Sequence, residues 1–466
     1  MFRYFRMGVG SLRGAGMSVG VEVADADLGR EGGDRPPRWN VATRIGFRFC
    51  FVYFGLFCVL TPQILFAFTG WFGERLSEGA QQWQTKLLGP VYQWVGRELF
   101  GVDAVAHQSG SGDQAVFWVA LFCTFVVAVV ATVVWTAFDR RRAEYRTVAG
   151  WFLLFVRLCV AGQLISYGMA KVIPAQMPPP TLKTLLEPYG NLPPMSVLWS
   201  QTGSSQPYEI LLGCAELLAG LLLVLPRTAM AGALLSLVDT ALVFVLNMTF
   251  DVPIKIISSH LMLMSLVLLA PEARRLVGSL LGGATAASAY PQPFRTPRAR
   301  WIAAVAQVAL GVWVLVDVAN VSWHGWREYG GGRPKPPLYG IWNVSEFTRD
   351  GQPVAPLVTD RTRWRRIVFD YPGVAQVQRM DDSFATSKAA VDTGSHRLVL
   401  SAPPTTAAEQ PKPMATFTFR QPAADRLELT GDMDGHPVTL SLTRVDPDSF
   451  PQRSTGFHWV QEYSVN

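Results

Sequence analysis

The fold is decided by residues 207–271, which read PYEILLGCAELLAGLLLVLPRTAMAGALLSLVDTALVFVLNMTFDVPIKIISSHLMLMSLVLLAP. The stretch holds three apolar blocks, at 207–225, 229–249 and 254–271, joined by short polar corners. Each block is close to the about 20 residues that a helix needs to cross roughly 30 Å of hydrocarbon. The apolar residues form continuous blocks instead of one-sided stripes, so the pattern predicts three consecutive membrane-spanning helices.

Four further blocks, at 46–70, 115–138, 150–172 and 301–321, bring the prediction to seven spans, and Pro62 and Gln63 interrupt the first. Composition agrees, because 49% of the 466 residues are hydrophobic and only 16% are charged. An average soluble domain is roughly 25% charged. We therefore expect an all-α polytopic membrane bundle over residues 41–325, with the lipid bilayer as a partner.

Basic residues gather in the loops at one end of the predicted spans. They are Arg35, Arg38, Arg44, Arg140, Arg141, Arg142, Arg146, Arg227, Arg274, Arg275, Arg295, Arg298 and Arg300. Because loops rich in Lys and Arg stay on the cytoplasmic side, this end is predicted to be cytoplasmic. The expected location is a bacterial inner membrane, with the N-terminus inside and the C-terminal region periplasmic. The net charge of +6 is then an orientation signal, and no nucleic-acid partner is expected.

The N-terminal segment 1–40 is rich in Gly, Arg and Asp and has no apolar core of the kind that a signal peptide requires. It is predicted to be a disordered cytosolic tail, and either Met1 or Met17 is the start of translation.

A different composition begins after the last span. Residues 326–337 are expected to be a linker, since they include the Gly- and Pro-rich segment GGGRPKPP at 330–337. Residues 338–466 alternate between polar and apolar, which predicts strands near 340–348, 363–370, 374–380, 384–392, 396–402, 414–421, 425–431 and 436–444. Hairpin turns are expected at Asp350-Gly351, Pro372-Gly373, Asp381-Asp382 and Asp434-Gly435. Eight such strands predict an all-β, up-and-down barrel, whose interior is either packed or holds one small ligand.

Nine strongly polar residues lie within or at the ends of four apolar blocks: Arg157, Lys171, Glu209, Glu216, Asp239, Asn247, Asp251, Lys255 and His260. Ionisable groups in hydrocarbon cost several kcal/mol each, so they pair with one another, face a wet cavity or serve function. These residues define the candidate site.

Lys171 and Glu216 are the central candidates. Tyr167 lies one helical turn before Lys171, and Glu209 lies seven residues before Glu216, on the same helix face. We predict that Lys171 and Glu216 act catalytically and that Tyr167 and Glu209 bind ligand. Two simpler roles remain open, because Lys171 can extend to the lipid head groups and Glu216 can hydrogen-bond between helices. Arg157 is expected to be an anchor at the cytoplasmic interface.

The corner between the fifth and sixth spans supplies the remaining candidates. Asn247, Asp251 and Lys255 lead to His260, and Asp239 lies deeper in the fifth span. A histidine side chain titrates near neutral pH in general, so His260 and these four neighbours are predicted to relay protons or to bind a polar head group. The alternative is that Asp251 and Lys255 pair only to fold the corner.

Metal and thiol chemistry find little support in the sequence. The five cysteines, Cys50, Cys58, Cys123, Cys159 and Cys214, all lie in predicted spans, and no two form a C-x-x-C pair. His396, His436 and His458 also lack the spacing of metal ligands. No metal site and no dithiol redox centre are expected from these patterns.

Residues 150–275 resemble the DoxX-like family of small four-helix bacterial membrane proteins. The resemblance is carried by Tyr167-Gly168-Met169-Ala170-Lys171-Val172-Ile173-Pro174, by Glu216 between Gly213 and Gly220, and by the segment Asn247–His260. The family includes a subunit of an archaeal thiosulfate:quinone oxidoreductase and components of membrane redox complexes. The resemblance implies that Lys171, Glu216 and His260 bind a quinone head group or move its protons, as part of an oxidoreductase that also has a redox partner protein.

The second predicted domain suggests a different function. Gly340-Ile341-Trp342 resembles the Gly-x-Trp opening of lipocalin-type barrels, in which the Trp closes one end. This resemblance implies a non-enzymatic carrier or scaffold that binds an apolar ligand in its barrel. The aromatic segment 456–463 is expected to plug the barrel or pack on the bundle. A transporter ranks last, because no inverted repeat is evident.

Overall fold

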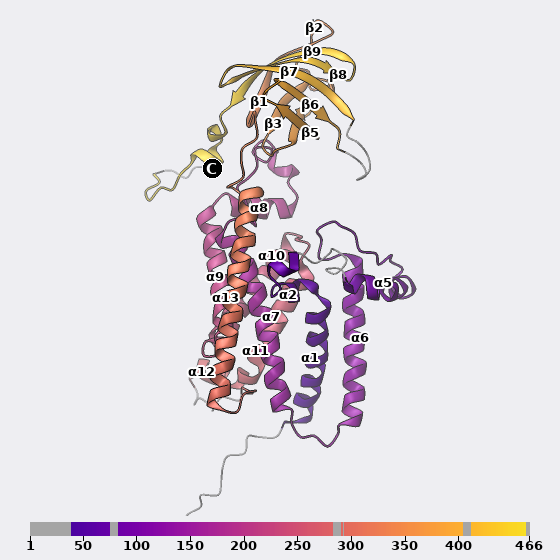
Figure 1. Cartoon of the computed structure of the whole chain (residues 1–466), viewed down its shortest axis with the longest axis vertical. Helices are drawn as coiled ribbons and strands as arrows, with labels where there is room; N and C mark the ends of the chain where they lie inside the picture. The colour runs from indigo at the N-terminus through magenta and orange to yellow at the C-terminus, as the bar shows by residue number, and fades with distance from the viewer. Residues whose placement is uncertain (1–38, 75–82, 283–289, 292, 404–411, 463–466) are drawn as a thin grey trace, which may run out of the picture.

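The computed structural model describes residues 39–74, 83–282, 290–291, 293–403 and 412–462. A helical bundle and a β-barrel are stacked along the long axis of the molecule, with the barrel at one end of the bundle (Figure 1). Almost all of the predicted N-terminal tail, with the choice between Met1 and Met17, lies outside the described residues.

The helical region contains seven helices that are long and apolar enough to cross a membrane, counted over the described ranges. They are α1 (Val41–Leu60), α6 (Ala115–Phe138), α7 (Arg146–Val172), α9 (Gln206–Val224), α10 (Ala229–Thr249), α11 (Lys255–Leu269) with its helical continuation to Ser279, and α13 (Pro297–Glu328). Apolar side chains such as Val130 and Val133 of α6 point outward and are exposed. This is the surface of a helix that faces lipid, and the chain is a multi-pass membrane protein.

The first span differs from the prediction of 46–70. Helix α1 begins at Val41, after the Asn40 side chain accepts a hydrogen bond from the Thr43 amide, and it ends at Leu60. Pro62 forces the preceding Thr61 into an extended conformation and offers no amide hydrogen to the helix. Short helices α2 (Pro62–Phe66) and α3 (Trp71–Glu74) follow this break.

Helix α7 is the centre of the bundle. In the most apolar 18-residue stretch of α7, 72% of the residues are buried, compared with 22% in the corresponding stretches of α10 and α13. Its closest neighbour is α9, because glycines let the two backbones touch. A Cβ at Gly168 would lie 2.5 Å from the Leu217 amide nitrogen, and one at Gly213 would lie 2.7 Å from the Gly168 carbonyl oxygen. This close approach places the side chains of α7 directly against those of α9.

Shorter helices surround the spans. Helix α5 (Trp83–Val95) and the π-helical turn η1 (Gly96–Phe100) lie beside one end of α6 (Figure 1). Tyr92 and Val95 are buried, whereas Leu87 and Trp94 are exposed, which leaves an apolar face for the bilayer surface. Helices η3 (Ala270–Glu272) and α12 (Ala273–Leu280) continue from α11.

The barrel consists of consecutive antiparallel strands, closed by pairing of the first with the last. The strands are β1 (Gly340–Arg349), β3 (Trp364–Phe369), β4 (Val374–Arg379), β5 (Phe384–Asp392), β6 (Arg397–Ser401), β7 (Pro413–Ala423), β8 (Arg426–Met433) and β9 (His436–Val445), with the two-residue β2 (Gln352–Pro353) at one edge. Positive φ angles occur at Asp350 and Gly351 and again at Asp434 and Gly435, as tight hairpins require. The predicted fold class, an α-helical membrane bundle followed by an eight-stranded barrel, is confirmed.

The barrel interior is filled with side chains. Trp342, Phe347 and Phe417 are at most 2% exposed and belong to one continuous apolar cluster. The Trp342 indole donates a hydrogen bond of 2.8 Å to the Leu338 carbonyl oxygen at the entry to β1. Of the two predicted interiors, the structure therefore has the packed one.

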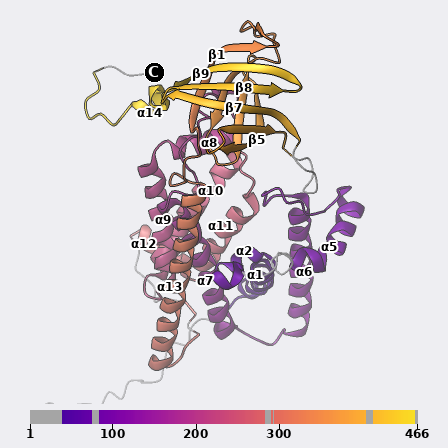
Figure 2. The ribbon, with the colours of Figure 1, turned by 45° about the horizontal axis from the view of Figure 1, so that its top comes forward.

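The Pro-rich segment 173–206 joins the barrel to the bundle. It contains η2 (Tyr189–Asn191) and α8 (Pro194–Gly203), and Figure 2 shows α8 beneath the barrel. The Asp370 carboxylate of the barrel accepts the Leu182 amide at 2.8 Å and pairs with Arg333 at 2.5 Å. Leu182, Ile341 and Val368 form a buried apolar contact beside this pair. The segment is thus an ordered layer on which the barrel docks.

The end of the chain does not fill the barrel. After η4 (Pro447–Ser449) and α14 (Pro451–Ser454), Phe457 is 78% exposed and Trp459 is 92% exposed. The expectation that this aromatic segment plugs the barrel or packs on the bundle is therefore wrong for these two residues. Tyr463 is not described.

Candidate functional site

Lys171 and Glu216 form an ion pair inside the bundle. The ammonium of Lys171 on α7 lies 2.7 Å from both carboxylate oxygens of Glu216 on α9. Lys171 is 6% exposed and Glu216 is 3% exposed. Bidentate, charge-assisted contact offsets part of the cost of removing both groups from water. Lys171 therefore does not extend to the head groups, and the two central candidates act as one unit.

Tyr167 and Gln63 border this pair. The Tyr167 ring centre lies 5.9 Å from the Lys171 ammonium, and its hydroxyl accepts a 2.5 Å hydrogen bond from the Gln63 amide. The Gln163 side chain fixes Gln63 by donating to its backbone carbonyl at 3.0 Å. Sequence reasoning assigned no role to Gln63. Its position directly after the helix-breaking Pro62 was the signal available.

Two more carboxylates interact electrostatically with the Lys171–Glu216 ion pair. Glu209 of α9 is fully buried; one of its oxygens accepts the Met177 amide at 2.9 Å, and the other has no hydrogen-bond partner. Asp239 of α10 interacts electrostatically with Glu216 and Lys171, and one of its oxygens is also unpartnered. If all three carboxylates were ionised around one ammonium, two negative charges would lack compensation. Binding protons relieves that state.

His260 belongs to a separate group. Its Nδ1 lies 2.7 Å from the Ile256 carbonyl oxygen and its Nε2 lies 2.9 Å from the Tyr53 hydroxyl. A carbonyl oxygen only accepts, so Nδ1 carries the hydrogen and Nε2 accepts from Tyr53. The ring also stacks on Phe57 of α1 at 3.9 Å. A neutral imidazole thus has both nitrogens satisfied, and its partners lie on α1 and α11, whereas Lys171 and Glu216 meet between α7 and α9.

The corner after α10 is held together by its own charges. Lys255 pairs with Asp251 at 2.8 Å, and Asp113 accepts the backbone amides of Lys255 and Ile256 at 2.7 and 3.0 Å. Asp113 therefore caps α11 from a distant loop. These contacts agree with the alternative that Asp251 and Lys255 fold the corner. Asn247 is buried nearby, and its side-chain nitrogen has no partner.

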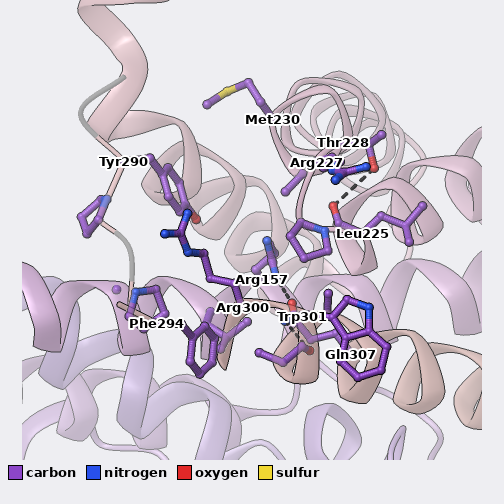
Figure 3. Close-up of a pocket in the computed structure, with 18 of the residues that line it drawn as sticks. Arg157, Leu225, Arg227, Thr228, Met230, Tyr290, Phe294, Arg300, Trp301 and Gln307 are labelled. Carbon is purple, nitrogen blue, oxygen red and sulfur yellow. Dashed lines mark hydrogen bonds between the residues drawn. The ribbon is translucent and has the colours of Figure 1, made fainter. Parts of the chain in front are cut away.

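A third polar group lies at the end of the bundle opposite the barrel. Arg157 of α7 is buried and donates to the side-chain oxygen of Gln307 on α13. It lines a pocket of about 1040 Å³ together with Arg227, Arg300 and Trp301 (Figure 3). Arg157 was expected at the interface as an anchor. It lies instead inside the bundle, and the pocket was not anticipated, because the loop arginines were used only to assign orientation.

Arg48 is a further buried charge without a predicted role. Its guanidinium donates to the hydroxyls of Tyr145 and Thr136 at 2.6 and 2.9 Å and to the Asp139 carbonyl at 2.7 Å. The Tyr145 hydroxyl in turn donates to the Asp139 carboxylate and holds the pKa of that carboxyl below its usual range. This network ties α1 to the loop between α6 and α7, which is a structural role.

Two of the cysteines meet despite their spacing. The thiols of Cys58 on α1 and Cys159 on α7 interact, and Cys58 donates to the Met264 sulfur at 3.5 Å. The absence of a C-x-x-C pair therefore did not exclude a close thiol pair. Across the described ranges, no three His, Cys, Asp or Glu side chains gather in a way that would hold a metal ion.

Comparison with known proteins gives one clear relationship. The chain is similar to the uncharacterized protein YwoB of Bacillus subtilis (strain 168), with 31% identity over 147 residues. The match covers 30% of this chain and 85% of YwoB. No family model and no solved structure matches the chain. Because the similarity extends over most of YwoB, the chain belongs to the same family as that protein.

Proposed function

We propose that this membrane protein is a quinone-linked component of a redox complex in the bacterial inner membrane. Its site is the centre formed by Lys171, Glu216, Glu209 and Asp239. The observation that carries this proposal is the excess of carboxylates around one ammonium, with unpartnered oxygens on Glu209 and Asp239. Quinone reduction and quinol oxidation require sites that take up and release protons. The DoxX-like resemblance of residues 150–275 supports this role for Lys171 and Glu216, but not the separate position of His260.

The residues of this centre fit a quinone head group by their hydrogen-bonding chemistry. A quinone carbonyl accepts hydrogen bonds, which the Lys171 ammonium and the Tyr167 hydroxyl can donate. A quinol hydroxyl donates, and the free oxygens of Glu209 and Asp239 accept. The quinone supplies two-electron chemistry when bound. The side chains orient its head group and hold or release protons at the carboxylates, and a partner protein is the proposed electron donor.

The orientation belongs to the proposal. The loops that carry Arg140 and Arg227, and the first turn of α13 with Arg298, lie at the end of the bundle opposite the barrel (Figure 1). With that end in the cytoplasm, the barrel is periplasmic. Lys171 is the penultimate residue of α7, so the quinone would bind in the outer half of the membrane.

The barrel is less suited to the carrier role that its lipocalin-like opening suggested. An apolar ligand would have to displace Trp342, Phe417 or their neighbours, which are packed against one another. Its buried contacts with the Pro-rich segment instead favour a docked cap above the bundle. We assign the chemistry to the bundle and a covering role to the barrel.

The experiment is a titration of the full-length protein in nanodiscs with ubiquinone-1. Lys171→Met/Glu216→Gln removes both charges together, so neither group is left as an uncompensated buried ion. We expect its Kd to rise at least about tenfold, which corresponds to about 1.4 kcal/mol. Asp251→Asn, which alters an exposed carboxylate in the nearby corner, is the control and should bind as the parent does. Failure of the parent protein to bind, or equal Kd values for parent and double variant, would contradict the proposal.

A further inference from the structure

We propose that the pocket between α7, the α9–α10 loop and α13 binds the phosphate group of an anionic membrane lipid. The pocket has a volume of about 1040 Å³, and Figure 3 shows residues that line it. The ends of the helices that form it lie opposite the barrel (Figure 1). Ligand pockets usually have volumes of about 300–1,000 Å³. This space is therefore large enough for a lipid head group together with the first part of its acyl chains.

A buried arginine in the wall of the pocket is incompletely satisfied. Arg157 is only 6% exposed, yet its Nε has no hydrogen-bond partner. Within the described residues, its guanidinium donates to the neutral side-chain amide of Gln307. A buried guanidinium normally requires an anion. An anionic ligand in the pocket would supply the missing acceptor.

The mouth of the pocket adds positive charge. Arg227 precedes α10, Arg300 lies in the first turn of α13, and both are exposed. Arg275 also lines the space but is already paired with Glu272 at 3.2 Å. Arginine binds phosphate through its planar fork of donors, so three guanidiniums around one cavity suit a phosphate group better than a neutral head group.

The remaining walls favour a lipid over a soluble phosphate compound. Leu154, Met230, Phe294 and Val308 are apolar, and Trp301 is 69% exposed at the rim. Tryptophan is enriched at the level of the lipid head groups. Basic pockets between membrane helices are also sites where acidic lipid head groups bind. The pocket thus joins an arginine-rich polar part to an apolar part, as an anionic amphiphile does.

The test compares full-length protein in nanodiscs of phosphatidylcholine alone with nanodiscs that contain a minor share of phosphatidylglycerol. Lipid that stays bound after gentle release is measured by native mass spectrometry. The parent should retain phosphatidylglycerol at least about tenfold more strongly than Arg227→Gln/Arg300→Gln, since each basic residue near the surface contributes substantially to binding of acidic lipids. Ala304→Trp, which fills the pocket without changing charge, should lose the lipid as well.

Arg274→Gln/Arg298→Gln is the matched control. It removes two exposed arginines from the same end of the bundle, and neither lines the pocket. Equal losses in both double variants, or full retention in Ala304→Trp, would overturn the proposal. A further arm adds inorganic phosphate to the parent protein. Displacement of the lipid by millimolar phosphate would overturn the lipid as the source of the phosphate group.

Discussion

The bundle and the barrel bury different kinds of side chain. The barrel encloses aromatic and aliphatic groups such as Trp342 and Phe417. Its buried charged residues, Arg363 and Asp370, directly flank the two ends of β3, and Asp370 lies at the junction with the bundle. The bundle buries Lys171, Glu216 and Glu209 in a region that must exclude water. Because charges in hydrocarbon are costly, they persist only where they are paired or used. The difference assigns packing to the barrel and chemistry to the bundle.

The largest expected effect comes from splitting the Lys171–Glu216 pair. Glu216→Gln removes the carboxylate that contacts the buried Lys171 ammonium and should destabilise the bundle by about 3–5 kcal/mol. The double variant Lys171→Met/Glu216→Gln should recover much of that loss. Thermal unfolding in nanodiscs measures both. If the single variant is as stable as the parent, the pair does not carry the cost that its burial implies.

The stability of the barrel should depend on its packed apolar core, so a substitution that leaves a cavity should destabilise it. Phe417→Ala removes a fully buried ring and should destabilise the barrel by about 3–5 kcal/mol. It should leave ubiquinone-1 binding unchanged, because Phe417 lies in the apolar barrel cluster and not in the bundle. A matched change at the surface, Phe457→Ala, should affect neither property. Loss of quinone binding in Phe417→Ala would break the division of roles between the two regions.

A substitution at the junction tests which contacts hold the barrel on the segment 173–206. Asp370→Asn weakens the ion pair with Arg333 and the hydrogen bond to the Leu182 amide, at a cost of about 2 kcal/mol. Hydrogen exchange should then accelerate in the segment 173–206, while the barrel strands stay protected. Asp392→Asn, in an exposed barrel turn, is the control. Unchanged exchange in 173–206 would mean that the barrel is held by other contacts.

The cap of α11 should have a smaller effect. Asp113→Ala leaves the amides of Lys255 and Ile256 without their acceptor and should cost about 1 kcal/mol. The melting temperature should fall slightly, with quinone binding retained. Asp103→Ala, at an exposed ion pair with Arg97, provides the comparison and should change stability less. A larger loss in Asp103→Ala would contradict the capping role.

The smallest effect on stability is expected at low pH, where the Asp360 carboxyl at the barrel surface becomes protonated. Thr362 and Arg363 donate hydrogen bonds to Asp360 and hold the pKa of its carboxyl below the usual range. A depressed pKa contributes stability above the unfolded pKa of about 3.9, and this contribution is lost as the pH falls through the folded pKa. Thr362→Ala should raise the pKa of Asp360, as measured by NMR titration of the carboxyl carbon. An unchanged pKa would exclude the hydroxyl as its cause.

Local patterns explain why so much of the fold was predictable. Continuous apolar blocks marked all seven spans, and alternation with Asp-Gly turns marked the eight strands. The first span was misplaced because Thr61 and Pro62 break the helix inside an apolar block. Seven-residue spacing predicted that Glu209 and Glu216 share a helix face, but it did not indicate that Glu216 meets Lys171 of α7.

Tertiary contacts account for what the sequence did not reveal. Tyr53 meets His260 across 207 positions of the chain, and Asp113 caps a helix that begins 142 residues later. No local spacing encodes such pairs. The same holds for Arg157 and Gln307, whose meeting forms one wall of the arginine-lined pocket.

Infrared difference spectroscopy tests the central claim most directly. The full-length protein in nanodiscs would be measured before and after addition of ubiquinone-1, following the C=O stretch of protonated carboxyl groups. The account predicts a quinone-induced change in this band that disappears in Glu209→Gln/Asp239→Asn and persists in Phe417→Ala. An identical band change in the parent and in Glu209→Gln/Asp239→Asn would contradict it, because the carboxylates around Lys171 would then have no part in quinone binding.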